Sequence, residues 1–149
     1  MFLTKSRFVA ALTCPTKLFY MADTDYANQS AEDTFLAALA EGGFQVGELA
    51  KQYFPEGINI VSLDTKKALA ETNELLKNEN VIIFEAAIKY ENCFIRVDIL
   101  EKKGNLIKIH EVKAKSFSGT EGANFLKKDG TPNSTWKKYL YDVAFQKWV

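Results

Sequence analysis

Three stretches in the second half of the chain decide the predicted fold: VIIFEAAIKY (residues 81–90), CFIRVDILE (93–101) and LIKIHEVKAK (106–115). They are rich in β-branched and aromatic residues, which favour strands, whereas alanine and leucine dominate the residues before Asn80. Glu91-Asn92 and Gly104-Asn105 supply turn residues between the stretches. We therefore predict an antiparallel meander of three consecutive strands.

Apolar residues recur at helical spacing before this meander. Cys14-Pro15 separates the first two predicted helices, because proline can begin a helix but interrupts one that precedes it. Gly42-Gly43 is predicted to end the third helix, and the fourth is predicted to turn Val46, Leu49 and Tyr53 inward. The predicted helices cover residues 6–12, 16–21, 30–42, 45–53 and 65–77, with a short strand over 59–63.

The end of the chain is predicted to be a helix that packs back on the sheet. Trp136, Tyr139, Leu140 and Val143 repeat at helical spacing, and neither glycine nor proline follows them. We therefore expect the chain to be part of a longer polypeptide. Residues 116–133 are rich in glycine, serine and lysine, which predicts an exposed loop.

Length and composition indicate one α/β domain over residues 1–149, in the cytoplasm and without a membrane segment. No apolar run approaches the roughly 18 residues that cross a bilayer, and no signal peptide is recognisable. Nineteen lysine and arginine residues balance nineteen acids, which argues against a passive nucleic-acid coat. The two cysteines, Cys14 and Cys93, are too few for a disulfide framework or a closed zinc site.

An acid interrupts the second predicted strand and faces another acid on the third. With a hairpin turn near Lys103-Gly104, Asp98 falls opposite or diagonal to residues 109–111, so Asp98 and Glu111 can converge. Two carboxylates are the hard oxygen ligands that Mg²⁺ or Mn²⁺ prefers. Lys113 points to the same side as Glu111 and can orient or deprotonate a water and offset transition-state charge. The set predicts a metal-dependent phosphodiesterase site.

Two structural interpretations stay open beside this one. Glu111, Lys113 and Lys115 alternate along a strand, as the charges of a solvated face do. An ion pair between Asp98 and Lys113 would also satisfy an acid that interrupts apolar residues, without any catalysis. In a regular strand, Asp98 lies on the face opposite to Ile95, Val97 and Ile99.

Asp98, followed after twelve residues by Glu111-Val112-Lys113, resembles the signature of the PD-(D/E)XK nuclease superfamily. Val97 stands where that signature often has proline. Further segments resemble its RecB-related branch, and more narrowly the nuclease-like domain of an uncharacterised bacterial protein family. They are LTKSRFVAALTCPTKLFY (3–20), FEAAI (84–88), RVDIL (96–100) and YLYDVAFQ (139–146).

The resemblance implies a restriction-endonuclease-like core that hydrolyses phosphodiester bonds of DNA, with RNA as an alternative, using Mg²⁺ or Mn²⁺. It implies that Asp98 and Glu111 bind the metal and that Lys113 is the catalytic lysine. The family often adds an acid from a helix before the sheet. Glu48 is our candidate for that acid, and Glu85 is its competitor.

Gln146 resembles the glutamine of the branch's Gln-x-x-x-Tyr motif, which helps to place the nucleic-acid strand. The tyrosine of that motif would follow Val149 directly. Tyr139, on nearly the same helix face, and Lys115 are our further candidates for nucleic-acid binding. Relatives can hold an iron–sulfur cluster through one amino-terminal cysteine and three carboxyl-terminal ones. Cys14 matches the first, but the three are missing, so we expect no cluster.

Two further functions are open on the sequence alone. The fold could serve as a catalytically inactive module that binds nucleic acid or protein. It could also be a structural domain that docks to the remainder of a longer polypeptide through the exposed face of its last helix.

Overall fold

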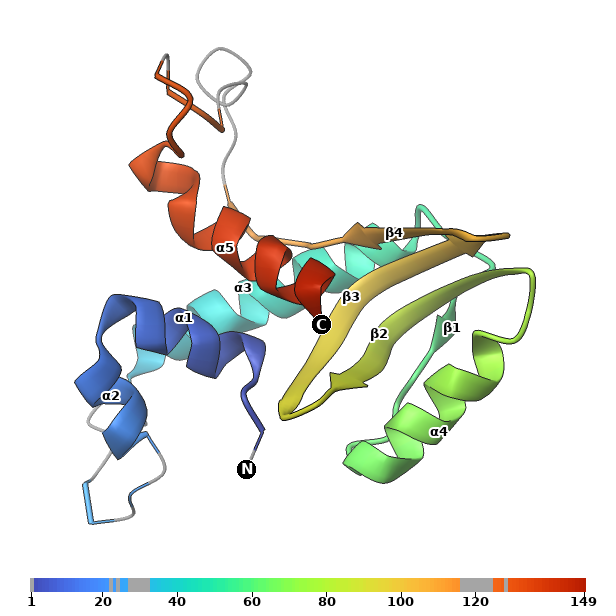
Figure 1. Ribbon diagram of the computed structural model, residues 1–149, viewed down its shortest axis with the longest axis horizontal. Helices are drawn as coiled ribbons and strands as arrows, with labels where there is room; N and C mark the ends of the chain where they lie inside the picture. The colour runs from blue at the N-terminus through green and yellow to red at the C-terminus, as the bar shows by residue number, and fades with distance from the viewer. Residues whose placement is uncertain (1, 22, 24, 27–32, 116–124, 128) are drawn as a thin grey trace.

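The computed structural model describes residues 2–21, 23, 25–26, 33–115, 125–127 and 129–149. These residues form a mixed α/β fold with a four-stranded mixed sheet and five helices (Figure 1). The helices are α1 (Lys5–Thr13), α2 (Pro15–Tyr20), α3 (Thr34–Lys51), α4 (Thr65–Leu75) and α5 (Ser134–Trp148). The strands are β1 (Ile58–Asn59), β2 (Asn80–Tyr90), β3 (Cys93–Lys103) and β4 (Leu106–His110). None of the described helices is both long and apolar enough to cross a bilayer.

The sheet order is β1-β2-β3-β4, and β2, β3 and β4 form the predicted antiparallel meander. The turn between β3 and β4 is closed by Gly104 at φ 55°, a conformation that glycine adopts without steric cost. The short strand predicted over 59–63 is present as β1, which spans only Ile58–Asn59 and adds a parallel pair to β2, so the sheet has one strand more than the meander. The strand ends where the Ile60 carbonyl accepts a hydrogen bond from the Arg96 guanidinium, which also donates to the Ser62 carbonyl.

The third strand of the meander ends earlier than predicted. Its ladder with β3 stops at the pair Ile99–His110, whereas we predicted a strand to residue 115. The Val112 amide donates to Asp98 Oδ2 at 2.8 Å, so a side chain replaces the next ladder partner. Glu111 and Lys113 therefore lie on a segment beyond the strand.

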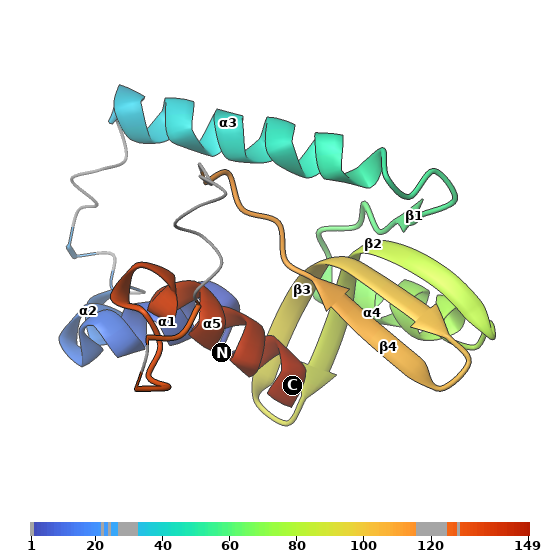
Figure 2. The ribbon, with the colours of Figure 1, turned by 90° about the horizontal axis from the view of Figure 1, so that it is seen from above.

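Helices cover both faces of the sheet (Figure 2). On one face, α4 packs through Ala68, and α5 through Phe145, against the main core, which contains Ile83, Ile95 and Val97. On the other face, the carboxyl-terminal end of α3, the turn after it and Val112 pack on the sheet. There, Ala50 and Phe54 contact a smaller cluster of Ile82, Phe84 and Ile99.

Helix α3 is continuous, although we predicted two helices separated by Gly42-Gly43. Its amino terminus is capped by the Asp33 side chain, which accepts hydrogen bonds from the amides of Phe35 and Leu36. Each interior glycine costs only about 1 kcal/mol relative to alanine, which eighteen residues of helix tolerate. The predicted inward face was wrong for Leu49, which is 63% exposed, and for Tyr53, which is 82% exposed, whereas Val46 is half-buried.

Candidate functional site

Asp98 and Glu111 converge, as predicted from the hairpin register. The last ladder pair joins Ile99 to His110. Asp98, which precedes Ile99, therefore lies opposite Glu111, which follows His110. The Lys5 ammonium lies 3.2 Å from Asp98 Oδ1 and 3.2 Å from Glu111 Oε2, which shows that the two carboxylates face a common point. The hairpin and the end of β4 therefore build the centre of the site.

The strands are irregular at this place. Glu85 has φ 56°, in the left-handed region that costs a non-glycine residue on the order of 1 kcal/mol or more, and it is skipped in the register between β2 and β3. Beyond it the faces exchange: Val97 lies in the main core, whereas Ile99 lies in the smaller cluster. The predicted common face of Ile95, Val97 and Ile99 was therefore wrong, and the consecutive residues Asp98 and Ile99 both border one cavity.

Glu111 is the most enclosed carboxylate of the predicted set, with 5% of its side chain exposed. Burial by itself raises its pKa, but hydrogen bonds from Lys113 and Gln146 and the charge of Lys5 outweigh it and hold the pKa below the ordinary value. The Gln146 amide donates to Glu111 Oε2 at 2.6 Å. Glu111 is therefore an ionised carboxylate whose orientation is set from α5.

Lys113 lies between two carboxylates. Its ammonium pairs with Glu111 and approaches Asp142 Oδ2 to 3.3 Å. Burial favours the neutral amine, yet the hydrogen bond and charge of Glu111, followed by the charges of Asp142 and Asp98, raise the pKa of Lys113 above its ordinary value. Lys113 is thus held as a cation, which suits it to donate hydrogen bonds rather than to remove a proton.

Helix α5 contributes a buried pair, Asp142 and Gln146, one helical turn apart. The Gln146 amide nitrogen donates to Asp142 Oδ1 at 3.1 Å as well as to Glu111. Burial and the nearby charge of Glu111 raise the pKa of Asp142. Gln146 is only 2% exposed, and its Oε1 is buried without a hydrogen-bond partner. It lies beneath the carboxylates and orients them. Its predicted role in placing a nucleic-acid strand stays a prediction.

We use the term carboxylate cluster for these bonded side chains, which come from α1, β3, the segment after β4 and α5: Lys5, Asp98, Glu111, Lys113, Asp142 and Gln146.

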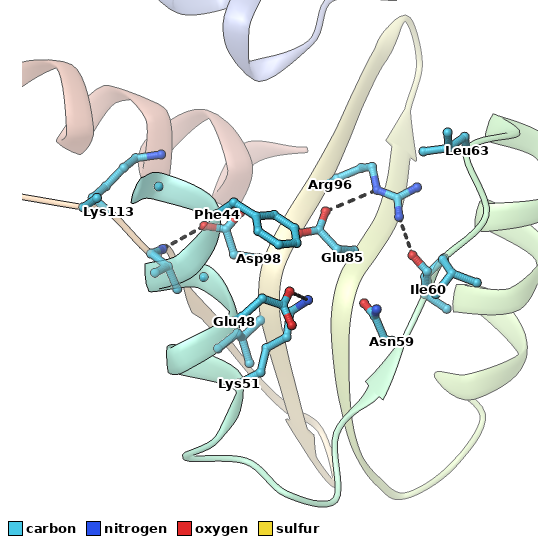
Figure 3. Close-up of a pocket in the computed structure, with 16 residues that line it drawn as sticks. Phe44, Glu48, Lys51, Asn59, Ile60, Leu63, Glu85, Arg96, Asp98 and Lys113 are labelled. Carbon is cyan, nitrogen blue, oxygen red and sulfur yellow. Dashed lines mark hydrogen bonds and ion pairs between the residues drawn. The ribbon is translucent and has the colours of Figure 1, made fainter. Parts of the chain in front are cut away.

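The cluster borders a cavity of about 880 Å³ between the sheet and α3 (Figure 3). The sheet-side wall includes Glu85, Arg96, Asp98 and Lys113, and α3 contributes Gly43, Phe44, Gly47, Glu48 and Lys51 on the other side.

Neither candidate for the additional acid joins the two carboxylates. Glu48 pairs with Lys51 at 2.6 Å, and Glu85 pairs with Arg96 at 3.4 Å. Within the described ranges, no group of three or more histidine, cysteine, aspartate and glutamate side chains is placed to hold a metal ion. Of the predicted ligands, the structure brings together Asp98 and Glu111.

Lys115 and Tyr139 lie beside the site and are engaged with each other. The Lys115 ammonium lies 4.0 Å from the centre of the Trp136 ring and 5.1 Å from that of Tyr139, and it donates to the Thr135 carbonyl at 3.2 Å. These cation–π contacts join the segment after β4 to α5. Glu111, Lys113 and Lys115, which we predicted on one face of a strand, therefore do not stay together. Glu111 and Lys113 belong to the carboxylate cluster, whereas Lys115 contacts α5.

The donor set suits a divalent metal ion, because the two carboxylates already hold a cation. The Lys5 ammonium stands within hydrogen-bond distance of one oxygen of each, so the place is shaped for positive charge. Mg²⁺ and Mn²⁺ prefer such oxygen ligands, and Mg²⁺ commonly keeps several waters beside one or two carboxylates. Asp98 and Glu111 would hold the ion.

Sequence reasoning missed Lys5 and Asp142. Asp142 precedes Gln146 by four residues and so shares its helix face, a signal that could have been noticed. Lys5 lies 93 residues from Asp98 and 106 from Glu111, and no local pattern connects them.

Comparison with known proteins found no match to the chain among protein-family models, curated proteins or solved structures.

Proposed function

We propose that this protein is a Mg²⁺- or Mn²⁺-dependent nuclease that hydrolyses phosphodiester bonds of DNA. The observation that carries the proposal is the convergence of Asp98, in the middle of β3, and Glu111, directly after β4, beside the Lys113 ammonium and an open cavity. The choice of nucleic acid, and of DNA before RNA, rests on the resemblance of Asp98 and Glu111-Val112-Lys113 to the PD-(D/E)XK signature.

In this proposal, Asp98 and Glu111 bind the metal ion through the oxygens that now accept from Lys5. A bound Mg²⁺ or Mn²⁺ supplies Lewis acidity toward a phosphoryl oxygen and lowers the pKa of a coordinated water. Gln146 keeps the Glu111 carboxylate in place by donating to Oε2, the role of an orienting residue behind a ligand.

Lys113 acts as a hydrogen-bond donor in the proposed reaction. Its raised pKa keeps the amine protonated near neutral pH, so it orients the attacking water and offsets charge that develops on the phosphoryl oxygens. The substrate would lie in the cavity, where Arg96 and Lys51 add positive charge on opposite sides.

Thermal unfolding with and without Mn²⁺ tests the proposal before any substrate is chosen. At a Mn²⁺ concentration about 100 times its dissociation constant, the wild-type protein should gain roughly 2.7 kcal/mol, a shift of several degrees. Asp98→Ala and Glu111→Ala should each abolish the shift. Glu74→Ala, which alters an exposed ion pair with Lys77, is the matched control and should keep it.

Cleavage assays then address the reaction. The wild-type protein with Mn²⁺ should cut DNA, and Asp98→Ala should not. Cleavage of RNA but not of DNA would identify RNA as the substrate. Absence of any Mn²⁺ effect on stability would remove the proposed function.

A second candidate is an inactive nuclease-fold module that binds nucleic acid or protein. It is favoured by the ion pairs of the cluster, because Lys5 and Lys113 already neutralise the carboxylates that a metal would need. Mn²⁺ binding by the wild type without cleavage of DNA or RNA would favour this candidate.

A further inference from the structure

A lysine from the first turn of α1 occupies the point on which the two proposed metal ligands converge. Lys5 Nζ lies 3.2 Å from Asp98 Oδ1 and 3.2 Å from Glu111 Oε2, and 22% of its side chain is exposed. The other Asp98 oxygen accepts from the Val112 amide, and the other Glu111 oxygen pairs with Lys113. Lys5 therefore bonds the oxygens that no other cation of the cluster contacts.

The position of Lys5 is not explained by the helix that carries it. It is the first residue of α1, where the helix dipole presents its positive end, and a cation there is unfavourable by a few tenths of a kcal/mol to about 1 kcal/mol. Thr4 caps the helix through the Arg7 amide, without a contribution from Lys5. The two carboxylates supply the compensating attraction.

The backbone on both sides of Lys5 is held independently of the carboxylates. Leu3 makes a bridge to the start of β3, donating to the Asn92 carbonyl at 2.9 Å and accepting from the Phe94 amide at 3.0 Å. Phe8 stacks on Phe145 of α5 with ring centres 4.5 Å apart. The Lys5 ammonium can consequently leave the carboxylates by side-chain rotation while α1 stays docked.

The charges of the cluster favour exchange of this ammonium for a divalent ion. With their carboxyl groups ionised, Asp98, Glu111 and Asp142 face only two ammonium groups, which leaves one net negative charge. Replacing one ammonium by a divalent cation makes the cluster neutral. One pair of oxygens cannot hold both cations at the same point, since like charges repel.

We infer that Lys5 is a resident counter-cation that competes with the divalent metal ion for Asp98 and Glu111. The inference rests on the proposed function, since it concerns the same metal site, and it adds an element that controls the filling of that site. Lys5 holds the ligands together in the metal-free protein and sets the metal concentration at which the exchange occurs.

The first test compares Mn²⁺ affinities by titration calorimetry. Lys5→Met keeps most of the side-chain length without the charge, so it should unfold at a lower temperature without metal and bind Mn²⁺ about tenfold more tightly. Lys5→Arg keeps the charge and should stay within about threefold of the wild type. Lys77→Met, which removes an equal charge at an exposed pair with Glu74, is the control and should bind as the wild type does.

The second test uses the wild-type protein and does not depend on the folding of a variant. Acetic anhydride labelling, read by mass spectrometry, should show that Lys5 becomes more reactive when Mn²⁺ is added, because its ammonium leaves the carboxylates. Lys77 serves as the internal reference and should keep its reactivity. In Asp98→Ala with the same Mn²⁺, the increase at Lys5 should be lost.

The outcomes separate this inference from the proposed function. Mn²⁺ binding of equal affinity by the wild type and Lys5→Met, or no change in Lys5 labelling, overturns the competition and leaves the metal site intact. If neither protein binds Mn²⁺, the proposed function fails and the inference fails with it. Tighter binding by Lys5→Met together with increased Lys5 labelling in the wild type supports both.

Discussion

On the sheet side of the cavity, Asp98 and Glu111 are bonded to α1 and α5, whereas on the helix side Glu48 is bonded to Lys51, three residues further along α3. The first arrangement joins residues more than 90 positions apart and encloses Glu111, whereas no residue of α3 is buried. The same kinds of charged side chain thus form a coordinated cluster in one region and an ordinary local pair in the other. Burial, the pair with Lys113 and the long-range contacts from Gln146 and Lys5 together set the lowered pKa of Glu111.

The largest difference between the two regions should appear when apolar side chains are shortened. Ile95→Ala removes a core side chain that is 2% exposed and should lower the free energy of unfolding by about 2–5 kcal/mol. Leu49→Ala on α3, 63% exposed, should change it by no more than about 0.5 kcal/mol. Urea unfolding of both variants gives the comparison. A loss of several kcal/mol for Leu49→Ala would show that α3 is packed against something in solution.

Substitutions of polar residues should produce a smaller difference in the free energy of unfolding between the carboxylate cluster and α3. Gln146→Leu removes the donor shared by two carboxylates and should cost about 1.5–3 kcal/mol, because hydrogen bonds to charged groups are lost in a buried place. Glu48→Gln alters an ion pair whose acid is 48% exposed and should cost less than about 0.5 kcal/mol. The same urea experiment measures both. Equal losses would contradict the distinction between cluster and local pair.

Two glycines provide a matched pair for the backbone. A Cβ on Gly57, at the junction of α3 and β1, would overlap the buried Phe84 ring, so Gly57→Ala should destabilise by about 1–3 kcal/mol. A Cβ on Gly47 of α3 meets open space, and Gly47→Ala should stabilise by about 0.5–1 kcal/mol through helix propensity. Thermal unfolding tests both predictions, because the melting temperature should fall for Gly57→Ala and rise for Gly47→Ala. A destabilising Gly47→Ala would reveal a close approach to α3 at this residue.

The smallest effect is expected in the pH dependence, where two carboxyls of the cluster act in opposite directions. Glu111 has a pKa below its ordinary 4.5, so its contribution to stability is present above that pH and is lost as pH falls through the lower folded pKa. Asp142 has a pKa above its ordinary 3.8, so its contribution is present below that pH and is lost as pH rises through the higher folded pKa.

Substitutions by the corresponding amides separate these two contributions. Glu111→Gln should lose less stability than the wild type on acidification below pH 4.5, and Asp142→Asn should gain on the wild type as pH rises above 3.8. Melting temperatures measured across this range test both signs. If the melting temperatures of Asp142→Asn and the wild type change in parallel with pH, the pKa of Asp142 is not raised in the folded protein.

Helix and strand positions could largely be predicted, because caps, turns and periodicity act within a few residues. Asp33 and Asp64 cap α3 and α4 through amides two or three residues away, and Gly104 closes the hairpin locally. Two of the exceptions arose where a long-range contact replaced a local one. Asp98 takes the Val112 amide and ends β4, and Arg96 takes two carbonyls and ends β1.

By itself, the sequence determined the meander and, through its short hairpin, the approach of Asp98 to Glu111 and Lys113. Only the tertiary structure decided that Lys5 would bridge the two carboxylates, that Asp142 and Gln146 would support them, and that Glu48 would remain with Lys51. The physical reason is distance along the chain. A two-residue turn dictates which side chains face each other across a hairpin, whereas contacts across about a hundred residues depend on how whole helices pack on the sheet.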